Sequence, residues 1–536
     1  MKTLDNLTFD NRFVNALPAD PIDDNFCRQV SGACYSRVQP TAVANGSLVA
    51  YATEVAQLLD LSQATCESPF FTQLFSGNQQ VTGMDPYAMC YGGHQFGHWA
   101  GQLGDGRAIN LGEVINTSGE RWILQLKGAG RTPYSRTADG LAVLRSSVRE
   151  FLCSEAMFHL GVPTTRALSL VLTGEEVMRD MFYDGNPKNE LGAIVCRVAP
   201  SFIRFGNFEI FASRGENALL QQLVDYTIRT DFPNITFSGT ASTEIMLKWF
   251  EEICQTTLTM IIHWQRVGFV HGVMNTDNMS ILGLTIDYGP YGWLEDYDPN
   301  WTPNTTDAQG RRYCFGNQPQ IALWNLTQLA QTLLQLINEV APIQAILDNY
   351  WPTFETKWHT MMAEKLGLKR FAPESDTTLI SELQTILQLT ETDMTIFFRH
   401  LALIDIKTED LSTVTNTTLM APIKDAYYTH DTLTTEVVDQ ISGWLRKYIS
   451  RLSKDGLSWQ VRKENMDKVN PKYVLRNYLA HLAIEQAEKG DFTKISEMLE
   501  VVRTPYTDQP GKEAYGHKRP DWARHKSGCS MLSCSS

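Results

Sequence analysis

The sequence predicts an α+β protein whose first half is rich in strands and whose second half is helical. Two apolar stretches before residue 200, Trp122–Lys127 and Ile194–Val198, have the length and composition of strands. Beyond residue 200, apolar residues recur at helical spacing over long segments. The 536 residues, 43% hydrophobic and 20% charged, are typical of a folded protein with two to four core-forming units.

The predicted elements follow one another along the chain. Residues 1 to about 85 are expected to form an extension with short helices, such as Gly46–Leu61. The chain is dense in glycine from Tyr91 to Val114, and a helix is predicted at Ala142–Leu160, where Gly161-Val162-Pro163 ends it. Later helices are predicted at Asn217–Ile228, Thr243–Gly268, Leu323–Val340, Ser375–Leu389 and Pro471–Lys489.

Charge and hydropathy exclude several classes of partner. The net charge of -14, from 60 acidic and 46 basic residues, disfavours nucleic acid and anionic membranes. We find no run of about 18 apolar residues that could span a membrane. The start, Met1 to Asp5, lacks the apolar core of a secretory signal. We therefore expect a cytoplasmic protein with neither a nucleic-acid nor a membrane partner, and a monomer is the simplest expectation.

The ten cysteines do not indicate a metal centre. None occurs in a Cys-x-x-Cys pair, so a zinc site is not expected. Most should be buried, reduced thiols. Cys534, two residues from the end and close to Cys529, is expected to be exposed.

The most informative segment runs from His271 to Asn278 and is followed nine residues later by Asp287-Tyr288-Gly289. Protein kinases place an aspartate two residues after such a histidine and an asparagine seven residues after it. Asn278 is present here, but the position of the catalytic aspartate holds Val273, which cannot accept a proton. The chain therefore keeps the metal-ligand residues of a kinase and lacks its usual catalytic base.

The residues around Val273 suggest how the chemistry could proceed without the usual base. Asn278 and Asp287 offer hard oxygen ligands, which suit Mg²⁺ bridging nucleotide phosphates. Asp277 is the nearby carboxylate that could replace the base, or it could be an ordinary turn residue. His271 is expected to be structural, because the equivalent kinase histidine orients the loop.

Cationic residues of the first half complete a candidate nucleotide site. Lys127, at the end of a predicted strand, and Glu150, on the following helix, match the kinase lysine and the glutamate that holds it. Two exposed charges are the alternative. Arg197 lies within an apolar strand, and Arg204 follows it; such a guanidinium needs a carboxylate or a phosphate partner.

Two loops could surround the nucleotide. Gly101 to Arg107 is glycine-rich, which would let its backbone approach phosphates, although a plain hairpin turn is also common. Arg131 to Arg136, then Asp139-Gly140, form a polar loop that a kinase would not have here. Asp139 could reach a base or a ribose, or the loop could be a surface turn.

A strand-rich lobe followed by a helical lobe is the arrangement of a protein kinase. The sequence thus predicts a protein-kinase-like bilobal fold with an N-terminal extension and extra C-terminal helices. The expected division is 1–85 for the extension, 86–200 for the strand-rich lobe, 201–425 for the helical lobe and 426–536 for the C-terminal helices and tail.

The sequence resembles the selenoprotein O family (SelO, called YdiU in bacteria), a pseudokinase family of protein adenylyltransferases. The resemblance covers nearly the whole chain. It rests on long motifs, which are Tyr91 to Gly97, Gly104 to Arg107, Leu126 to Arg136, His271 to Asn278, Asp287 to Pro290, Asn470 to Asn477 and Cys534-Ser535-Ser536.

The resemblance implies that AMP is moved from a reversed ATP onto Ser, Thr or Tyr hydroxyls of proteins, with redox- or stress-linked targets. It implies that Asp277 accepts the proton and that Asn278 and Asp287 bind Mg²⁺ or Mn²⁺. Glu150 would orient Lys127. The implied nucleotide contacts are Gly104, Gly106, Arg107, Lys127, Asp139, Gly140, Arg197, Arg204 and Asp287.

Two alternatives remain open at this point. A conventional ATP-dependent phosphotransferase is disfavoured by Val273, and a nucleotide-binding pseudoenzyme scaffold by the retained ligands. The resemblance also implies a redox-sensitive tail at Cys534. No cysteine lies between Asp287 and Pro303, and the nearest downstream is Cys314, so its partner stays open.

Overall fold

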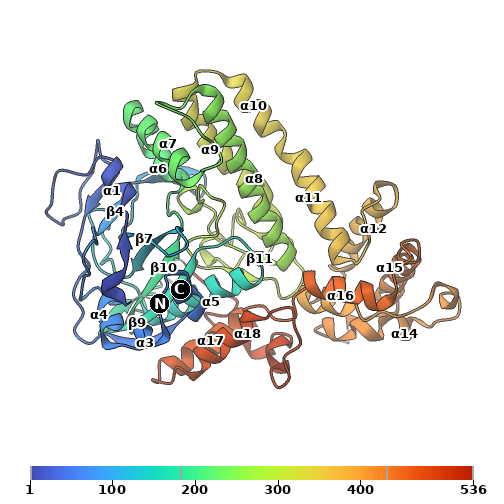
Figure 1. Ribbon diagram of the computed structural model, residues 1–536. Coiled ribbons are helices and arrows are strands. Elements are labelled where there is room, and N and C mark those ends of the chain that lie inside the picture. Colours follow the sequence, from blue (N-terminus) through green and yellow to red (C-terminus); the bar gives the residue numbers. More distant parts are fainter. Residues whose placement is uncertain (1–2, 182–183, 430–431, 534–536) are drawn as a thin grey trace.

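An antiparallel sheet of eight strands organises the first 200 residues (Figure 1). The computed structural model describes residues 3–181, 184–429 and 432–533. The strands lie in the order β2-β4-β7-β8-β10-β9-β3, and β1 pairs with β7. Their bounds are Thr8–Phe9 (β1), Tyr35–Arg37 (β2), Ser47–Tyr51 (β3), Tyr87–Met89 (β4), Ala108–Ile115 (β7), Arg121–Lys127 (β8), Arg166–Arg179 (β9) and Lys188–Ala199 (β10).

Both predicted strands are confirmed at the centre of this sheet. Trp122–Lys127 lies in β8 and Ile194–Val198 in β10, and the two strands are paired with Arg197 opposite Gln125. Their central residues are buried, including the polar residues Gln125 and Arg197.

Three strands of the sheet come from the first 85 residues. The segment Gly46–Leu61, expected to be a helix, is instead divided into strand β3 and helix α2 (Thr53–Leu58). Pairing of β3 with β9 decides this, since strand pairing across the chain overrides local helical spacing. The neighbouring short helices are α1 (Arg12–Ala16), α3 (Gln63–Cys66) and α4 (Pro69–Phe75).

Helix α5 (Leu144–His159) packs against β9 and β10 and confirms the predicted helix at Ala142–Leu160. Gly161, at a φ of 73°, and Pro163 follow its end. Helices α17 (Asn477–Ala487) and α18 (Thr493–Arg503) cover α5 (Figure 1). The helix predicted at Pro471–Lys489 thus starts six residues late, because Lys472 and Tyr473 donate their backbone N–H groups to the Pro505 carbonyl.

Helices dominate the chain beyond residue 200, as predicted. Those expected at Asn217–Ile228 and Thr243–Gly268 are confirmed, whereas α9 starts five residues earlier than expected. The helices are α6 (Phe205–Ser213), α7 (Asn217–Asp231), α8 (Thr243–Val267), α9 (Gln318–Ile337), α10 (Val340–Asp348), α11 (Tyr350–Lys365), α12 (Pro373–Ile386), α13 (Met394–Leu401), α14 (Asn416–Met420), α15 (Thr435–Ser453) and α16 (Trp459–Val469).

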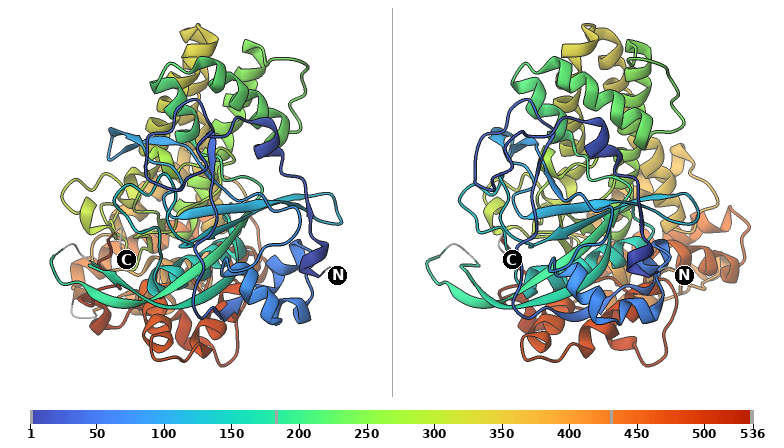
Figure 2. Two further views of the ribbon diagram at one scale, coloured as in Figure 1. Left: turned by 90° about the vertical axis from the view of Figure 1, so that its left-hand side faces the viewer. Right: turned by 60° about the vertical axis from the view of Figure 1, so that its left-hand side comes forward.

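Figure 2 shows the sheet between two groups of helices: the green and yellow helices on one side and the red C-terminal helices on the other. Two small two-stranded sheets lie outside the main one, β5 (Gly92–Gln95) with β6 (His98–Gln102) and β11 (Phe269–Val270) with β12 (Gly292–Trp293). In the described ranges, no helix is long and apolar enough to cross a membrane.

A buried ion cluster joins the C-terminal helices to the middle of the chain. Arg476, 1% exposed, pairs with the carboxylates of Glu295 and Asp393, and its Nη1 lies 2.8 Å from Asp393 Oδ2. Burial raises the pKa of Glu295, and the Arg476 guanidinium opposes that rise. The cation therefore compensates two buried carboxylates.

We expect Arg476→Met to destabilise the protein by about 3–5 kcal/mol, because it leaves two buried carboxylates without their cation. The measurement is the free energy of the first urea unfolding transition. The exposed pair Lys447–Glu382 provides the matched control, and Lys447→Met should change that energy by about 1 kcal/mol or less. Equal effects of the two substitutions would contradict the expectation.

Candidate active site

Lys127 and Glu150 form a buried ion pair between the sheet and helix α5. Lys127 is the last residue of β8, and its Nζ lies 2.7 Å from Glu150 Oε2. Burial lowers the pKa of Lys127, and the Glu150 carboxylate opposes the shift. The structure thus brings together the lysine and glutamate that the sequence paired.

Asp287 is the shared anion of three cations. Arg197 Nη1 donates to Asp287 Oδ1 at 2.6 Å, Arg204 Nη1 donates to Oδ2, and Lys127 Nζ lies 3.6 Å from Oδ1. Burial alone would raise the pKa of Asp287, but the charges of Arg204, Arg197 and Lys127 hold that pKa well below its usual range. Asp287 also has a φ of 57°, a left-handed conformation that is uncommon for residues other than glycine.

The two predicted loops lie against each other. Thr132 Oγ1 donates to the Asp105 carbonyl at 2.7 Å, and the Ser135 hydroxyl donates to the Gly106 carbonyl. A Cβ on Gly104 would lie 2.3 Å from the Tyr134 ring, so only glycine fits there. The glycine-rich turn is therefore no isolated hairpin turn but one half of a two-loop wall.

Asp139 has a protein partner that the sequence did not suggest. Its carboxylate accepts from Arg179 Nη1 at 2.7 Å and from Nη2 at 2.8 Å, which anchors the second loop to the end of β9. No sequence pattern indicated Arg179, because this contact depends on the long strand β9, which local patterning did not predict.

The catalytic-loop candidates lie opposite these loops. Asn278 Nδ2 donates to the Val273 carbonyl at 2.9 Å, which orients the amide. His271 is structural, as expected, since its Nε2 is 2.8 Å from the Ile286 carbonyl and its ring stacks on Trp264. Val273 lies in the wall of the same cleft, so the position of the usual base is apolar.

Asp277 is the buried carboxylate of this loop. Its side chain contacts the β5–β6 hairpin, where Gln95 Nε2 donates to Oδ2 at 3.3 Å. Burial raises the pKa of Asp277 to about 7, and Arg204 opposes that rise. Arg204 Nη1 donates to the Asp277 backbone carbonyl at 2.8 Å, so the same arginine contacts both acidic residues. Gln95 had no role assigned from the sequence.

These residues line one cleft of about 810 Å³. Of the sequence-derived candidates, all line it except Glu150, which lies behind Lys127. Its wall is strongly cationic for a protein of net charge -14. Seven cationic residues face four acidic ones: Arg107, Lys127, Arg131, Arg136, Arg179, Arg197 and Arg204 against Asp105, Asp139, Asp277 and Asp287.

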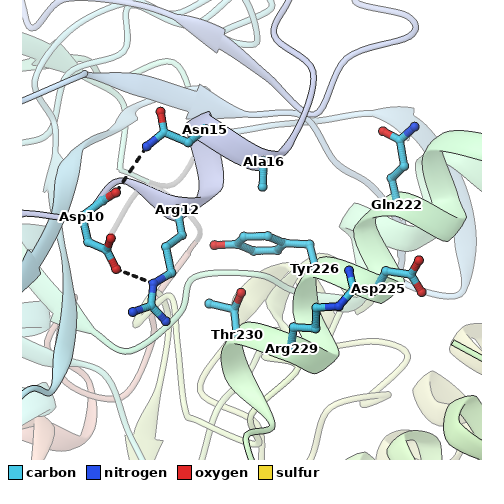
Figure 3. Close-up of a pocket in the computed structure, with 9 residues that line it drawn as sticks. All are labelled: Asp10, Arg12, Asn15, Ala16, Gln222, Asp225, Tyr226, Arg229 and Thr230. Atoms are coloured by element: carbon cyan, nitrogen blue, oxygen red, sulfur yellow. Dashed lines mark hydrogen bonds and ion pairs between the residues drawn. The ribbon is translucent and has the colours of Figure 1, made fainter. Parts of the chain in front are cut away.

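A second cavity of about 540 Å³ lies between the N-terminal segment and α7 (Figure 3). Arg12 pairs with Asp10, and Arg229 donates to the Gly239 carbonyl and lies 4.5 Å from the centroid of the Phe237 ring. Its two arginines face two aspartates, Asp10 and Asp225, so its wall lacks the excess of positive charge that the cleft offers to a phosphate.

The donor set of the cleft suits a divalent cation that arrives with phosphates. In the part of the chain that the structure describes, no three His, Cys, Asp or Glu side chains are grouped to hold a metal ion. Asn278 and Asp287 provide one amide oxygen and one carboxylate kept anionic. Mg²⁺ in nucleotide sites uses one or two protein oxygens plus phosphate oxygens and water, and this pair fits that pattern.

Nine cysteines are free thiols in the structure, and eight of them are buried. Cys529, expected near an exposed tail, is buried, as is Cys314. The Leu532 carbonyl accepts from the Thr305 backbone N–H at 2.8 Å, so the chain before the tail contacts the segment that follows Asp287. Cys534 lies outside the described residues.

A sheet-and-helix protein with a cationic cleft, an aspartate hub and an asparagine in the cleft wall has the features of a nucleotide-phosphate enzyme. The family model described as "Protein adenylyltransferase SelO" matches residues 25–503. The chain belongs to the SelO family, which confirms the resemblance seen in the sequence.

Curated relatives cover nearly the whole length of the chain. A "Protein nucleotidyltransferase YdiU" from Rhodopirellula baltica is 60% identical over 537 residues, 99% of each chain. The proteins of the same name from Azoarcus sp. and Aromatoleum aromaticum are 58% and 56% identical over 99% of this chain and 99% and 100% of their own lengths.

Proposed function

We propose that this protein is an adenylyltransferase that moves AMP from ATP to Ser, Thr or Tyr hydroxyls of other proteins. Its membership of the SelO family and relatives named protein nucleotidyltransferase support this reaction. The observation that carries it is the cleft, in which cations surround Asp287 while the usual kinase base position is Val273.

In the proposed reaction the hydroxyl oxygen bonds to the α-phosphorus, and the bond from that phosphorus to the bridging oxygen breaks. Pyrophosphate leaves with its electron pair, and the hydroxyl proton passes to Asp277. Charge develops on the phosphate oxygens, which preorganised cations stabilise. Lys127, Arg197 and Arg204 are held for this by Glu150 and Asp287. Gly104, Gly106, Arg107, Asp139 and Gly140 are the remaining proposed nucleotide contacts.

Asn278 and Asp287 are the proposed holders of Mg²⁺ or Mn²⁺. When bound, the ion would neutralise phosphate charge and polarise the phosphoryl oxygens. We further propose that the strand-rich and helical parts form a kinase-like pair of lobes, divided at about residues 85, 200 and 425. The position of Lys127 on β8 and Glu150 on α5 supports this.

The test is incubation with Mg²⁺ and ATP labelled on either the α- or the γ-phosphate. We expect label on protein from the α-labelled ATP alone, since AMP carries only that phosphate. The acceptors are a mixture of casein proteins and the enzyme itself. Label from the γ position alone would make the protein a kinase, and no label with intact ATP binding would favour a nucleotide-binding scaffold.

A further inference from the structure

The β5–β6 hairpin is bonded to the loop that carries Asp277, residue by residue. The His94 backbone N–H donates to Thr276 Oγ1 at 2.7 Å, and the Phe96 N–H donates to Asn275 Oδ1 at 3.2 Å. Between them, the Gln95 side chain donates to Asp277. Three consecutive hairpin residues thus contact three consecutive loop residues, although about 180 residues separate them in the chain.

Glycines allow this close approach. A Cβ on Gly93 would lie 2.7 Å from Asp277 Oδ1 and 2.9 Å from its Cβ. A Cβ on Gly206 would lie 2.1 Å from the Gly92 carbonyl oxygen, so α6 also requires a glycine where it meets the hairpin. Larger residues at either place would push the hairpin away from the loop.

A second layer of contacts holds the loop itself. The Thr276 hydroxyl donates to Glu209 on α6 at 2.5 Å, and His94 Nδ1 lies 2.9 Å from the other oxygen of the same carboxylate. Tyr313 OH donates to Asn275 Oδ1 at 2.6 Å. The side chains of Thr276 and Asn275 are therefore held by the hairpin, by α6 and by Tyr313.

The two oxygens of Asp277 have different surroundings. Oδ1 is buried against Gly93 and finds no hydrogen-bond partner among the described residues, whereas Oδ2 accepts from Gln95. Gln95 and Asp277 both line the cleft. Arg204 donates to the Asp277 backbone carbonyl, whereas Gln95 donates to the Asp277 side chain.

We infer that Gln95 is a positioning residue that holds Oδ2 of Asp277 toward the substrate hydroxyl. The inference rests on the proposed function. A carboxylate oxygen that accepts one hydrogen bond keeps a second lone pair for an incoming proton. Without Gln95 the carboxylate can rotate, and transfer slows because the base must lie within hydrogen-bond reach of the proton.

The test is Gln95→Met, which keeps the side-chain length and removes the donor. We expect AMP transfer to fall roughly 10- to 100-fold, the range for a lost hydrogen bond to a charged group, with an unchanged Kd for ATP. His98→Ala is the matched control, because His98 lies opposite Gln95 in the hairpin and is exposed. Gln95→Asn, one methylene too short to reach Oδ2, should reproduce the loss if Gln95→Met folds poorly.

A double-mutant cycle decides whether Gln95 acts through Asp277. In an Asp277→Asn background, Gln95→Met should cause no further loss. An additive loss, an unchanged rate in the single variants, or a parallel loss of ATP binding would each overturn the inference. If the unaltered protein transfers no label from α-labelled ATP, the proposed function fails and the inference fails with it. If the unaltered protein transfers label and Gln95→Met transfers it at the same rate, only the inference is overturned.

Discussion

Asp287→Asn is expected to abolish AMP transfer, with a fall of about 10³-fold or more, because loss of the proposed metal ligand and of a charge hub removes several kcal/mol of transition-state stabilisation. The asparagine keeps the shape of the side chain but leaves Arg197, Arg204 and Lys127 without their shared anion. Metal-dependent ATP binding should disappear as well. Transfer from α-labelled ATP and ATP binding with and without Mg²⁺ provide the two measurements.

The control for Asp287 is Asp225→Asn. Asp225 lines the second cavity, which shares no lining residue with the cleft, so transfer should continue at the rate of the unaltered protein. Thermal unfolding of both variants shows whether lost activity reflects lost structure. An Asp287→Asn protein that keeps metal-dependent transfer would remove this residue from the site.

Asp277→Asn is expected to slow transfer by about 10²- to 10⁴-fold, the range for a general base, while ATP still binds. The asparagine cannot accept the hydroxyl proton, but the Arg204 bond to the backbone carbonyl and the cations around Asp287 remain. Single-turnover transfer measures the chemical step, and equilibrium binding measures ATP affinity. Full activity would show that another group takes the proton.

Substitutions of Asp277 and Asp287 should therefore separate ATP binding from AMP transfer. Loss of Asp287 should affect both binding and transfer, whereas loss of Asp277 should affect transfer alone. If both variants lose ATP binding equally, Asp277 supports the fold of the cleft and is not the base.

Local pattern allowed much of the site to be predicted. Lys127 ends an apolar strand and Glu150 lies on the next helix, so short-range order along the chain placed them on neighbouring elements. The spacing from His271 to Asn278 identified the loop in the same way. The helix predicted at Thr243–Gly268 agrees with α8, which Ser242 caps at its start and Gly268 at its end.

Contacts between distant segments were not predictable. The pairing of β3 with β9 changed an expected helix into a strand, and the partner of Asp139 is Arg179 on that same long strand. Gln95 reaches Asp277 across 182 residues. Such contacts follow from strand register and loop packing. The periodicity of a short sequence window carries no information about either of them.

The sequence by itself determined the α+β division of the chain, the family and the residue types that the chemistry requires, since each is written in local spacing and long motifs. Only the tertiary structure decided that three cations share Asp287, that Asp139 is bound by Arg179 and that a hairpin holds Asp277. The physical reason is that burial and charge pairing depend on which surfaces meet when the chain folds.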